Sequence, residues 1–230
     1  MAQNNTPKHV AIIPDGNRRW AKENNFPPFE GHRKGFDTIK LIGKKARELG
    51  IKTLSIWAFS TENWQRSKQE IEYLMDIYEM WIDFHLTEAI KDNVRIIHIG
   101  RKDRLRDSLR KKLENAENKT KSFNKYYLCI GIDYGGKDEI IRGINLLINS
   151  KKSKISEADF EKVLDTKDLP YPNPDLIIRT SGEQRTSGFM IWQSAYSEYI
   201  FYNKYLPYFT PLDFEKCIED YKNRSRRFGE

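Results

Sequence analysis

The sequence predicts an α/β fold, a single domain in which helices flank a central, mostly parallel sheet of six strands. The first observation is the length, because 230 residues suit one large domain. The second is an alternation in which short apolar runs are followed four times by amphipathic segments. The third is that no repeat, low-complexity tract or long Gly/Ser/Pro linker divides the chain, so we expect one domain over residues 1–230.

Short apolar runs rich in β-branched residues are the predicted strands. The first stops at Pro14-Asp15-Gly16, a turn sequence that ends a buried strand. The next three are each followed by an amphipathic segment, as in a parallel sheet. The last two follow a proline-rich stretch at residues 169–174. In chain order, the predicted strands are residues 9–13, 53–59, 94–99, 127–132, 175–178 and 189–192.

Helices are predicted where apolar residues recur at steps of three and four. Gly50 stands where a C-terminal cap is expected, and Ser67 forms a capping box with Glu70 before a long helix with a bulky apolar side. Pro211 suits the first position of the last helix. The predicted helices begin near Asn17 and then cover residues 35–50, 67–82, 105–116, 140–147, 156–159 and 211–223.

The charge balance favours an anionic partner. Forty Lys+Arg against 33 Asp+Glu give a net charge of +7, which suits a phosphorylated small molecule, a nucleic acid or an anionic membrane. Cys129 and Cys217 are far apart in the sequence, so neither a disulfide framework nor a zinc site is indicated, and we expect a reducing cytoplasm. No signal peptide or membrane span is expected, because no long apolar stretch occurs.

The segments that follow the predicted strands carry most of the chemistry. Ligands of open parallel sheets bind outside the carboxyl ends of the strands. Arginines, small residues and a few carboxylates at one edge indicate a site for a polyanion, most simply a phosphate or diphosphate with a divalent metal. The segments are residues 15–19, 60–66, 100–101, 134–137 and 179–185.

The run Asp15-Gly16-Asn17-Arg18-Arg19 has two interpretations. In one, Asp15 or Asn17 only caps a helix, or Asp15 forms an ordinary salt bridge. In the other, an anion binds at the helix N-terminus, because two arginines there would otherwise oppose the helix dipole. Asp15 would then hold Mg²⁺ beside a diphosphate.

Arg179 and Arg185 form the second candidate anion site. Arginines on loops are usually surface charges. Here an apolar strand leads to Arg179, and hydroxyls and glycine amides nearby resemble a diphosphate cradle. Glu198 lies among aromatic residues and needs a cationic partner, either an arginine or a metal. His32 is the histidine expected near a ligand, whereas His85 and His98 are expected in the core or an interface.

Several common motifs are absent from the sequence. It contains no GxxxxGK[ST], GxGxxG, GxSxG or HExxH motif, and no Asp-Asp pair of the kind found in aspartate-rich all-trans prenyl synthases. These absences weaken the nucleotide-binding, dehydrogenase and hydrolase interpretations.

Five ordered blocks carry a family resemblance. They are DGNRRW within residues 9–20, AFSTENW at residues 58–64, YGGKDEI at residues 134–140, residues 174–185 and residues 189–201, and a closing RSRRFG segment follows at residues 224–229. Together they resemble the cis-prenyltransferase family, to which undecaprenyl diphosphate synthase belongs, over nearly the whole chain. The resemblance implies an undecaprenyl diphosphate synthase-like fold and a catalytic domain over residues 1–230.

The resemblance also implies an activity. Members condense isopentenyl diphosphate with an allylic diphosphate such as farnesyl diphosphate, form cis double bonds and use Mg²⁺. We therefore expect a homodimeric, cytoplasmic enzyme that makes undecaprenyl diphosphate or a similar lipid carrier, binds no nucleic acid and has at most peripheral membrane contact for product release.

Roles for individual residues follow from the same resemblance. Asp15 would hold the metal and assist loss of the allylic diphosphate, with Asn63 as a second catalytic residue in a mobile segment near Glu70. Glu198 would share the metal site in the paired subunits, and Arg227 and Gly229 would reach the neighbouring subunit. The implied substrate-binding residues are Gly16, Asn17, Arg18, Arg19, Trp20, His32, Ser60, Thr61, Glu62, Trp64, Arg66, Arg179, Arg185 and Ser187.

Three positions depart from the family pattern. Arg18 stands where bacterial undecaprenyl synthases usually have Gly, and Pro28 replaces an arginine that binds diphosphate. Either Arg18 compensates for Pro28, or the allylic site has changed, which leaves open a short-chain or irregular lavandulyl-type enzyme that couples C5 units. Asp133 replaces the usual Asn, and nothing in the sequence explains it.

Two questions stay open at this stage. The candidate walls of a tunnel for the growing chain are Ala58, Leu74, Ile77, Tyr78 and Trp81, and Tyr78 and Trp81 either limit product length or are simply core. A noncatalytic family subunit and a basic RNA-binding module are the alternative functional classes. The retained motif residues argue against the first, and cations at strand ends rather than on one face argue against the second.

Overall fold

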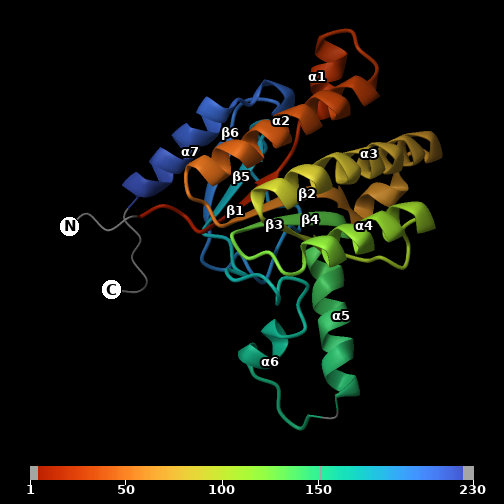
Figure 1. Ribbon diagram of the computed structural model, residues 1–230, viewed down its shortest axis with the longest axis vertical. Coiled ribbons are helices and arrows are strands. Elements are labelled where there is room, and N and C mark those ends of the chain that lie inside the picture. The colour runs from red at the N-terminus through yellow and green to blue at the C-terminus, as the bar shows by residue number, and fades with distance from the viewer. Residues whose placement is uncertain (1–4, 151, 225–230) are drawn as a thin grey trace.

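The computed structural model describes residues 5–150 and 152–224 (Figure 1). Its sheet has the order β3-β4-β2-β1-β5-β6, and every neighbouring pair is parallel. The predicted α/β class with six strands is confirmed, and the sheet is parallel throughout. The strands are β1 (His9–Ile13), β2 (Thr53–Ser60), β3 (Val94–Ile99), β4 (Tyr126–Tyr134), β5 (Leu176–Thr180) and β6 (Glu198–Tyr202).

The sixth strand lies later in the chain than predicted. Residues 189–192, the predicted strand, form turns, and β6 runs over Glu198–Tyr202 instead. The backbone explains the error, because Ser187, Gly188 and Met190 have φ values of 52°, 92° and 48°, and positive φ at three of four neighbouring residues turns the chain instead of extending it. Phe189 is fully buried against one face of the sheet without being part of a strand, so its apolar character does not indicate a strand.

The helices lie where the periodicity predicts them, with different bounds. The predicted helix at residues 35–50 begins earlier, at Pro28, and the long helix after Ser67 reaches Asp92. The α-helices are α1 (Asn17–Glu23), α2 (Pro28–Glu48), α3 (Lys68–Asp92), α4 (Asp107–Thr120), α5 (Gly136–Asn149), α6 (Glu157–Glu161) and α7 (Pro211–Asn223), and two short 3-10 helices are η1 (Thr61–Gln65) and η2 (Leu206–Tyr208). Within the described ranges, none of the helices has the length and apolar character needed to cross a membrane.

The two faces of the sheet are covered differently. Helices α7, α2, α3 and α4 lie in a row over one face, where the larger core is buried (Figure 1). The other face holds a smaller core in which Trp57 stacks on Phe189. Helices α5 and α6 lie on that second side and pack together around Phe160.

The topology places a crevice at the end of β1. From β1 the chain moves to β2 on one side, whereas from β5, which lies on the other side of β1, it moves away to β6. Ligands of open α/β sheets bind outside the carboxyl ends of strands at such a switch point. Residues that follow β1 and β5 are therefore expected to lie beside a ligand.

Candidate functional site

A cavity of about 230 Å³ opens at the carboxyl ends of β1, β2 and β5, at the predicted switch point. One side is apolar, lined by Phe36, Ile39, Ala58, Tyr78 and Leu206. The other side is polar. Eight of the residues predicted to form the site line it: Asp15, Asn17, His32, Ser60, Asn63, Arg66, Arg179 and Ser187.

Asp15 is held by cations and by the backbone. Arg179 Nη2 donates to its Oδ2 at 2.8 Å, and Arg19 Nη2 donates to Oδ1 at 3.2 Å. Burial alone would raise the pKa of Asp15, but the hydrogen bond and charge of Arg179, together with Arg19, hold it below its ordinary value. Thr180 Oγ1 accepts from the Asp15 amide at 2.8 Å and donates to its carbonyl oxygen at 2.7 Å. The result is an ionised carboxylate in a fixed place.

The loop after β5 forms a concave, cationic wall. Arg179 Nη1 donates to the Arg185 carbonyl oxygen at 2.6 Å and to Ser187 Oγ at 2.8 Å. Ser181 and Gly182 have φ values of 80° and 75°, and Ser187 has 52°. Left-handed residues in a loop turn successive amides toward one side, which suits an anion.

The packing of α1 on α2 places the next two polar residues. A Cβ at Gly31 would collide with the Asn17 carbonyl oxygen, and one at Gly35 would lie 2.5 Å from Asn17 Oδ1, so only glycines allow this approach. Asn17 Nδ2 lies 3.5 Å from His32 Nδ1. Asn17 Oδ1 and His32 Nε2 are buried without a hydrogen-bond partner. Both atoms are available to a bound ligand.

Glu70 at the start of α3 gathers the cations on the far side of the cavity. Arg66 Nη1 donates to Glu70 Oε1 at 2.9 Å, and Arg18 lies 3.7 Å from Oε2. His32 Nε2 is 3.9 Å from Oε1, but burial, with help from Arg66 and Arg18, lowers the pKa of His32 to about 4. His32 is therefore neutral near pH 7, and its contact with Glu70 is not an ion pair.

Some predicted substrate-binding residues lie outside the cavity lining. Arg19 donates to Glu183 Oε1 at 2.8 Å and to Ser181 Oγ at 2.7 Å, while Arg185 pairs with the other oxygen of Glu183. Arg185 is 60% exposed. These two arginines form an outer group that faces solvent.

Others have structural contacts of their own. Gly16 has a φ of 98° at the start of α1 and lies against Tyr205, and Trp20 stacks on Phe26 with 5.7 Å between ring centres. Thr61 and Glu62 begin η1 but do not line the cavity. Trp64 points to Asp133 and donates to Oδ1 at 2.8 Å.

Glu198 does not meet Asp15 within one chain. It pairs with Leu176 at the amino end of β5, whereas Asp15 follows the carboxyl end of β1. Arg224 Nη1 donates to Glu198 Oε2 at 2.8 Å, so an arginine supplies the cationic partner. The metal site expected between Glu198 and Asp15 is therefore not formed by one copy. Arg227 and Gly229 lie outside the described residues.

The donor set fits Mg²⁺ in a substrate-dependent way. Among the described residues, no group of three or more His, Cys, Asp or Glu side chains could hold a metal ion. Mg²⁺ usually binds one or two carboxylates together with waters and substrate phosphates, so it does not need such a group. Asp15 is ionised and half-buried, and it lies beside Arg179 and Arg19, which can bind phosphate groups. This matches that arrangement.

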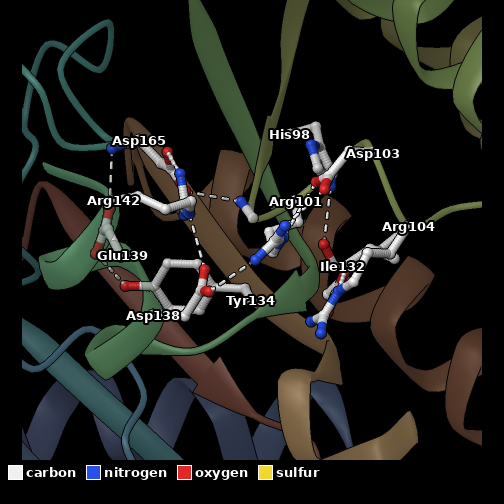
Figure 2. Close-up of polar contacts among 12 residues, drawn as sticks. His98, Arg101, Asp103, Arg104, Ile132, Tyr134, Asp138, Glu139, Arg142 and Asp165 are labelled. Carbon is white, nitrogen blue, oxygen red and sulfur yellow. Dashed lines mark hydrogen bonds and ion pairs between the residues drawn. The ribbon is translucent and has the colours of Figure 1, made fainter. Parts of the chain in front are cut away.

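The strand ends of β3 and β4 carry a separate charged cluster (Figure 2). Arg142 donates to Asp138 at 2.8 Å and to both oxygens of Asp165, at 2.9 and 2.6 Å, and Arg101 pairs with Asp138 and Asp103. None of these residues lines the cavity. The predicted rim segments at residues 100–101 and 134–137 thus belong to a network of their own.

Sequence reasoning missed part of the apolar wall. Phe36 and Leu206 both line the cavity, and helical periodicity marks Phe36 only as a core position. Leu206 lies in η2, and its amide donates to the Asp15 carbonyl oxygen at 3.0 Å, a contact that no local motif predicts.

A second hollow of about 210 Å³ continues between α2 and α3. Phe36 lines both hollows and lies between Tyr78 and Trp81, with ring centres 5.7 and 6.0 Å away. Of the predicted tunnel walls, Ala58 and Tyr78 line the first hollow, and Ile77 and Trp81 line the second. Leu74 is fully buried in the main core.

Known proteins are similar to this chain in sequence. A family model described as "Putative undecaprenyl diphosphate synthase" matches residues 13–229. An isoprenyl transferase of Thermotoga maritima is 44% identical over 97% of both chains. The farnesyl-diphosphate-specific ditrans,polycis-undecaprenyl-diphosphate synthase of Micrococcus luteus is 43% identical over 97% of this chain and 91% of its own.

Solved structures agree with these sequence matches. Lavandulyl diphosphate synthase from Lavandula x intermedia, in complex with dimethylallyl diphosphate, superposes with a TM-score of 0.96 at 36% identity, covering 99% of this chain and all of that one. A probable undecaprenyl diphosphate synthase from Campylobacter jejuni gives 0.82 at 34% identity, covering 97% and 99%. The resemblance predicted from the five sequence blocks is confirmed, and the chain belongs to the undecaprenyl diphosphate synthase family of cis-prenyltransferases.

Proposed function

We propose that this protein condenses isopentenyl diphosphate with an allylic diphosphate and releases a cis-polyprenyl diphosphate, most simply a lipid carrier such as undecaprenyl diphosphate. One observation carries the proposal. The cavity joins a cationic, hydrogen-bonding side at Asp15 and Arg179 to an apolar side at Phe36 and Tyr78. A diphosphate with a prenyl tail has the same two halves, which matches the activity named for the family's curated members.

Each side of the cavity then has a role. The allylic C1–O bond breaks, the double bond of isopentenyl diphosphate attacks C1, and a proton leaves C2 of the new unit. Mg²⁺, held by Asp15, would neutralise charge on the departing diphosphate. Arg179 and Ser187, already joined at 2.8 Å, are placed to hold the isopentenyl diphosphate. Asn17 Oδ1 and His32 Nε2, which are buried without hydrogen-bond partners, would bind the allylic diphosphate.

The segment after β2 supplies the remaining polar contacts. Ser60 and Asn63 form a reciprocal capping box, in which the Ser60 amide donates to Asn63 Oδ1 at 3.1 Å. This fixes Asn63 at the cavity wall beside Arg66. We assign Asn63 to substrate orientation near the proton that is lost, and Arg66 to the diphosphates.

Quaternary state and location complete the proposal. Strand β6 is a sheet edge that is half-buried along its whole length, with Tyr199 stacked on Phe201 at 6.1 Å, which suits burial against a second copy. A homodimer also offers Glu198 a route to the neighbouring site. Cys129 and Cys217 are free buried thiols, which supports a reducing cytoplasm.

A second candidate is an irregular enzyme that couples two C5 units. The similarity to lavandulyl diphosphate synthase favours it, and Pro28 stands at the first position of α2 with no side-chain donor. The curated relatives at 42–44% identity named undecaprenyl synthase or isoprenyl transferase favour the polyprenyl product.

The deciding experiment supplies Mg²⁺, labelled isopentenyl diphosphate and, in separate reactions, dimethylallyl, geranyl or farnesyl diphosphate. Long cis products from farnesyl diphosphate would support the lipid-carrier synthase. Coupling of C5 units alone, or a branched product, would establish the irregular enzyme. Absence of turnover with every starter would indicate a noncatalytic subunit.

Product length tests whether Phe36, whose ring lies near those of Tyr78 and Trp81, limits the growing chain. Phe36 lines both hollows, so Phe36→Ala is expected to widen the passage between them and lengthen the product. Leu41→Ala is a matched control, because Leu41 lies on the same helix but is 51% exposed. An unchanged product distribution in Phe36→Ala would show that Phe36 does not limit length.

A further inference from the structure

The carboxyl end of β4 carries a buried carboxylate that the reaction described above does not use. Asp133 is fully buried and has a φ of 52°. The backbone thus adopts a left-handed conformation that is uncommon outside glycine, asparagine and aspartate. A buried carboxylate is costly unless it is paired and hydrogen-bonded, so its partners show what it is for.

Those partners come from two distant segments. Arg104, in the loop between β3 and α4, donates Nε to Asp133 Oδ2 at 2.8 Å and a second hydrogen bond from Nη2 to Oδ1. Trp64, in η1, donates Nε1 to Oδ1 at 2.8 Å. The Arg104 guanidinium also lies 5.9 Å from the centre of the Trp64 ring. Asp133 and Arg104 therefore hold the indole from two sides.

Trp64 anchors residues 61–66, the segment that brings Asn63 and Arg66 to the cavity. It does not line the cavity, whereas both of those neighbours do. Its ring packs edge-to-face on Phe59 at 5.1 Å. The turn after Asp133 also touches this segment, because a Cβ at Gly135 would collide with Thr61 Oγ1. The carboxyl end of β4 thus packs against η1 and supports it.

We propose that Asp133 is a positioning residue for the condensation: through Trp64, and neutralised by Arg104, it holds residues 61–66 so that Asn63 and Arg66 face the substrates. The inference rests on the proposed function, because it concerns the orientation of residues assigned there. A displacement of about 1 Å in such a segment can cost on the order of 100-fold in rate.

The test uses Asp133→Ala, Trp64→Phe and the double variant in the full chain. Asp133→Ala removes both the acceptor for Trp64 Nε1 and the charge that pairs with Arg104, and Trp64→Phe removes the Nε1 donor. Asp165→Ala is the matched control, because Asp165 pairs with Arg142 in the neighbouring cluster (Figure 2), and none of its hydrogen bonds among the described residues reaches residues 61–66. Readouts are kcat, KM, urea unfolding and amide exchange of residues 61–66.

We expect Asp133→Ala and Trp64→Phe each to lower kcat about 10- to 100-fold and to speed amide exchange in residues 61–66, and we expect the two losses not to add in the double variant. The control is expected to lose stability without either effect. Additive losses, or equal kcat losses in Asp133→Ala and Asp165→Ala, would overturn the proposal. If the wild type shows no turnover, the proposed function fails alone, and amide exchange together with inorganic pyrophosphate affinity decides the positioning role.

Discussion

The two halves of the sheet's carboxyl edge contain the same residue types and use them differently. At β3 and β4, arginines 101 and 142 are each bonded to aspartates of the charged cluster (Figure 2). At β1, β2 and β5, a cavity is lined by polar side chains, and Asn17 Oδ1, His32 Nε2 and Arg179 Nε are buried without partners. Buried polar groups are normally satisfied, so unsatisfied ones around a cavity distinguish a binding site from a structural network.

We call the cavity side at β1, β2 and β5 the open half of the edge, and the paired side at β3 and β4 the closed half. The largest expected effect comes from removing the carboxylate of Asp15 in the open half. Among the described residues that line the cavity, Asp15 is the only carboxylate. Asp15→Asn is expected to lower kcat/KM by at least about 100-fold, because charge stabilisation at the departing diphosphate is lost. It also leaves Arg179, 5% exposed, without its anion and is expected to cost about 3 kcal/mol of unfolding free energy. Steady-state kinetics and urea unfolding measure the two effects.

Asp138→Asn is the control in the closed half. Asp138 binds Arg101 and Arg142 but lies outside the cavity lining. Its kcat/KM should stay within about twofold of the wild type. A comparable loss of activity in both variants would mean that the edge acts as one unit and the comparison is wrong.

The histidines offer a pH test of the same contrast. In the closed half, burial is the main cause that lowers the pKa of His98 to about 4, and its Nε2 lies 2.9 Å from the Ile132 carbonyl oxygen (Figure 2). The unfolded chain binds a proton near pH 6.5 and the folded chain only near pH 4, so the free energy of unfolding falls as the pH drops across this window. His98 alone is expected to contribute about 3 kcal/mol to that loss.

Urea unfolding of the wild type and His98→Gln at pH 7 and pH 4.5 measures the contribution of His98. The difference in unfolding free energy in favour of the wild type should shrink at the lower pH.

His32 should change its protonation when a ligand binds. Inorganic pyrophosphate would compensate Arg66 and Arg18, which help burial to lower the pKa of His32. The pKa of His32 should therefore rise when pyrophosphate binds. At pH 5.5 the wild-type protein should take up a proton on binding, and the His32→Gln variant should not. Equal proton uptake in the two proteins would place the anion elsewhere.

The open half was largely predictable and the closed half was not. Asp15, Arg179 and Ser60 follow strands, and parallel strands bring their carboxyl ends together, so local sequence was enough to group them. Asp133 had no interpretation because its partners Arg104 and Trp64 lie beyond the strand ends, in the loop after β3 and in η1, where strand pairing does not place side chains. The last strand was misplaced for a different reason. The positive φ values of Ser187, Gly188 and Met190 turn the chain before β6, and residue types alone do not reveal those turns.

A smaller effect is expected from Arg18. Its side chain is 59% exposed and lies 3.7 Å from Glu70 Oε2, and the other oxygen of Glu70 lies 3.9 Å from His32 Nε2. If Arg18 compensates for the donor missing at Pro28, Arg18→Gln should raise the KM of the allylic diphosphate about tenfold and leave that of isopentenyl diphosphate unchanged. Arg33→Gln is the control, since Arg33 pairs with Glu30 and is 63% exposed. Unchanged KM values would show that no compensation occurs.

The smallest effect should come from the exposed rim of the closed half. Arg101 binds Asp103, two residues away, at 2.6 Å and Asp138 at 3.4 Å, but its side chain is 32% exposed. Water and salt can replace such a pair, so Arg101→Gln is expected to change the unfolding free energy by less than about 1 kcal/mol and to leave both KM values unchanged. Urea unfolding and steady-state kinetics check this. A raised KM for either diphosphate would mean that anions also reach β3, and the dividing line between the two halves would move to include it.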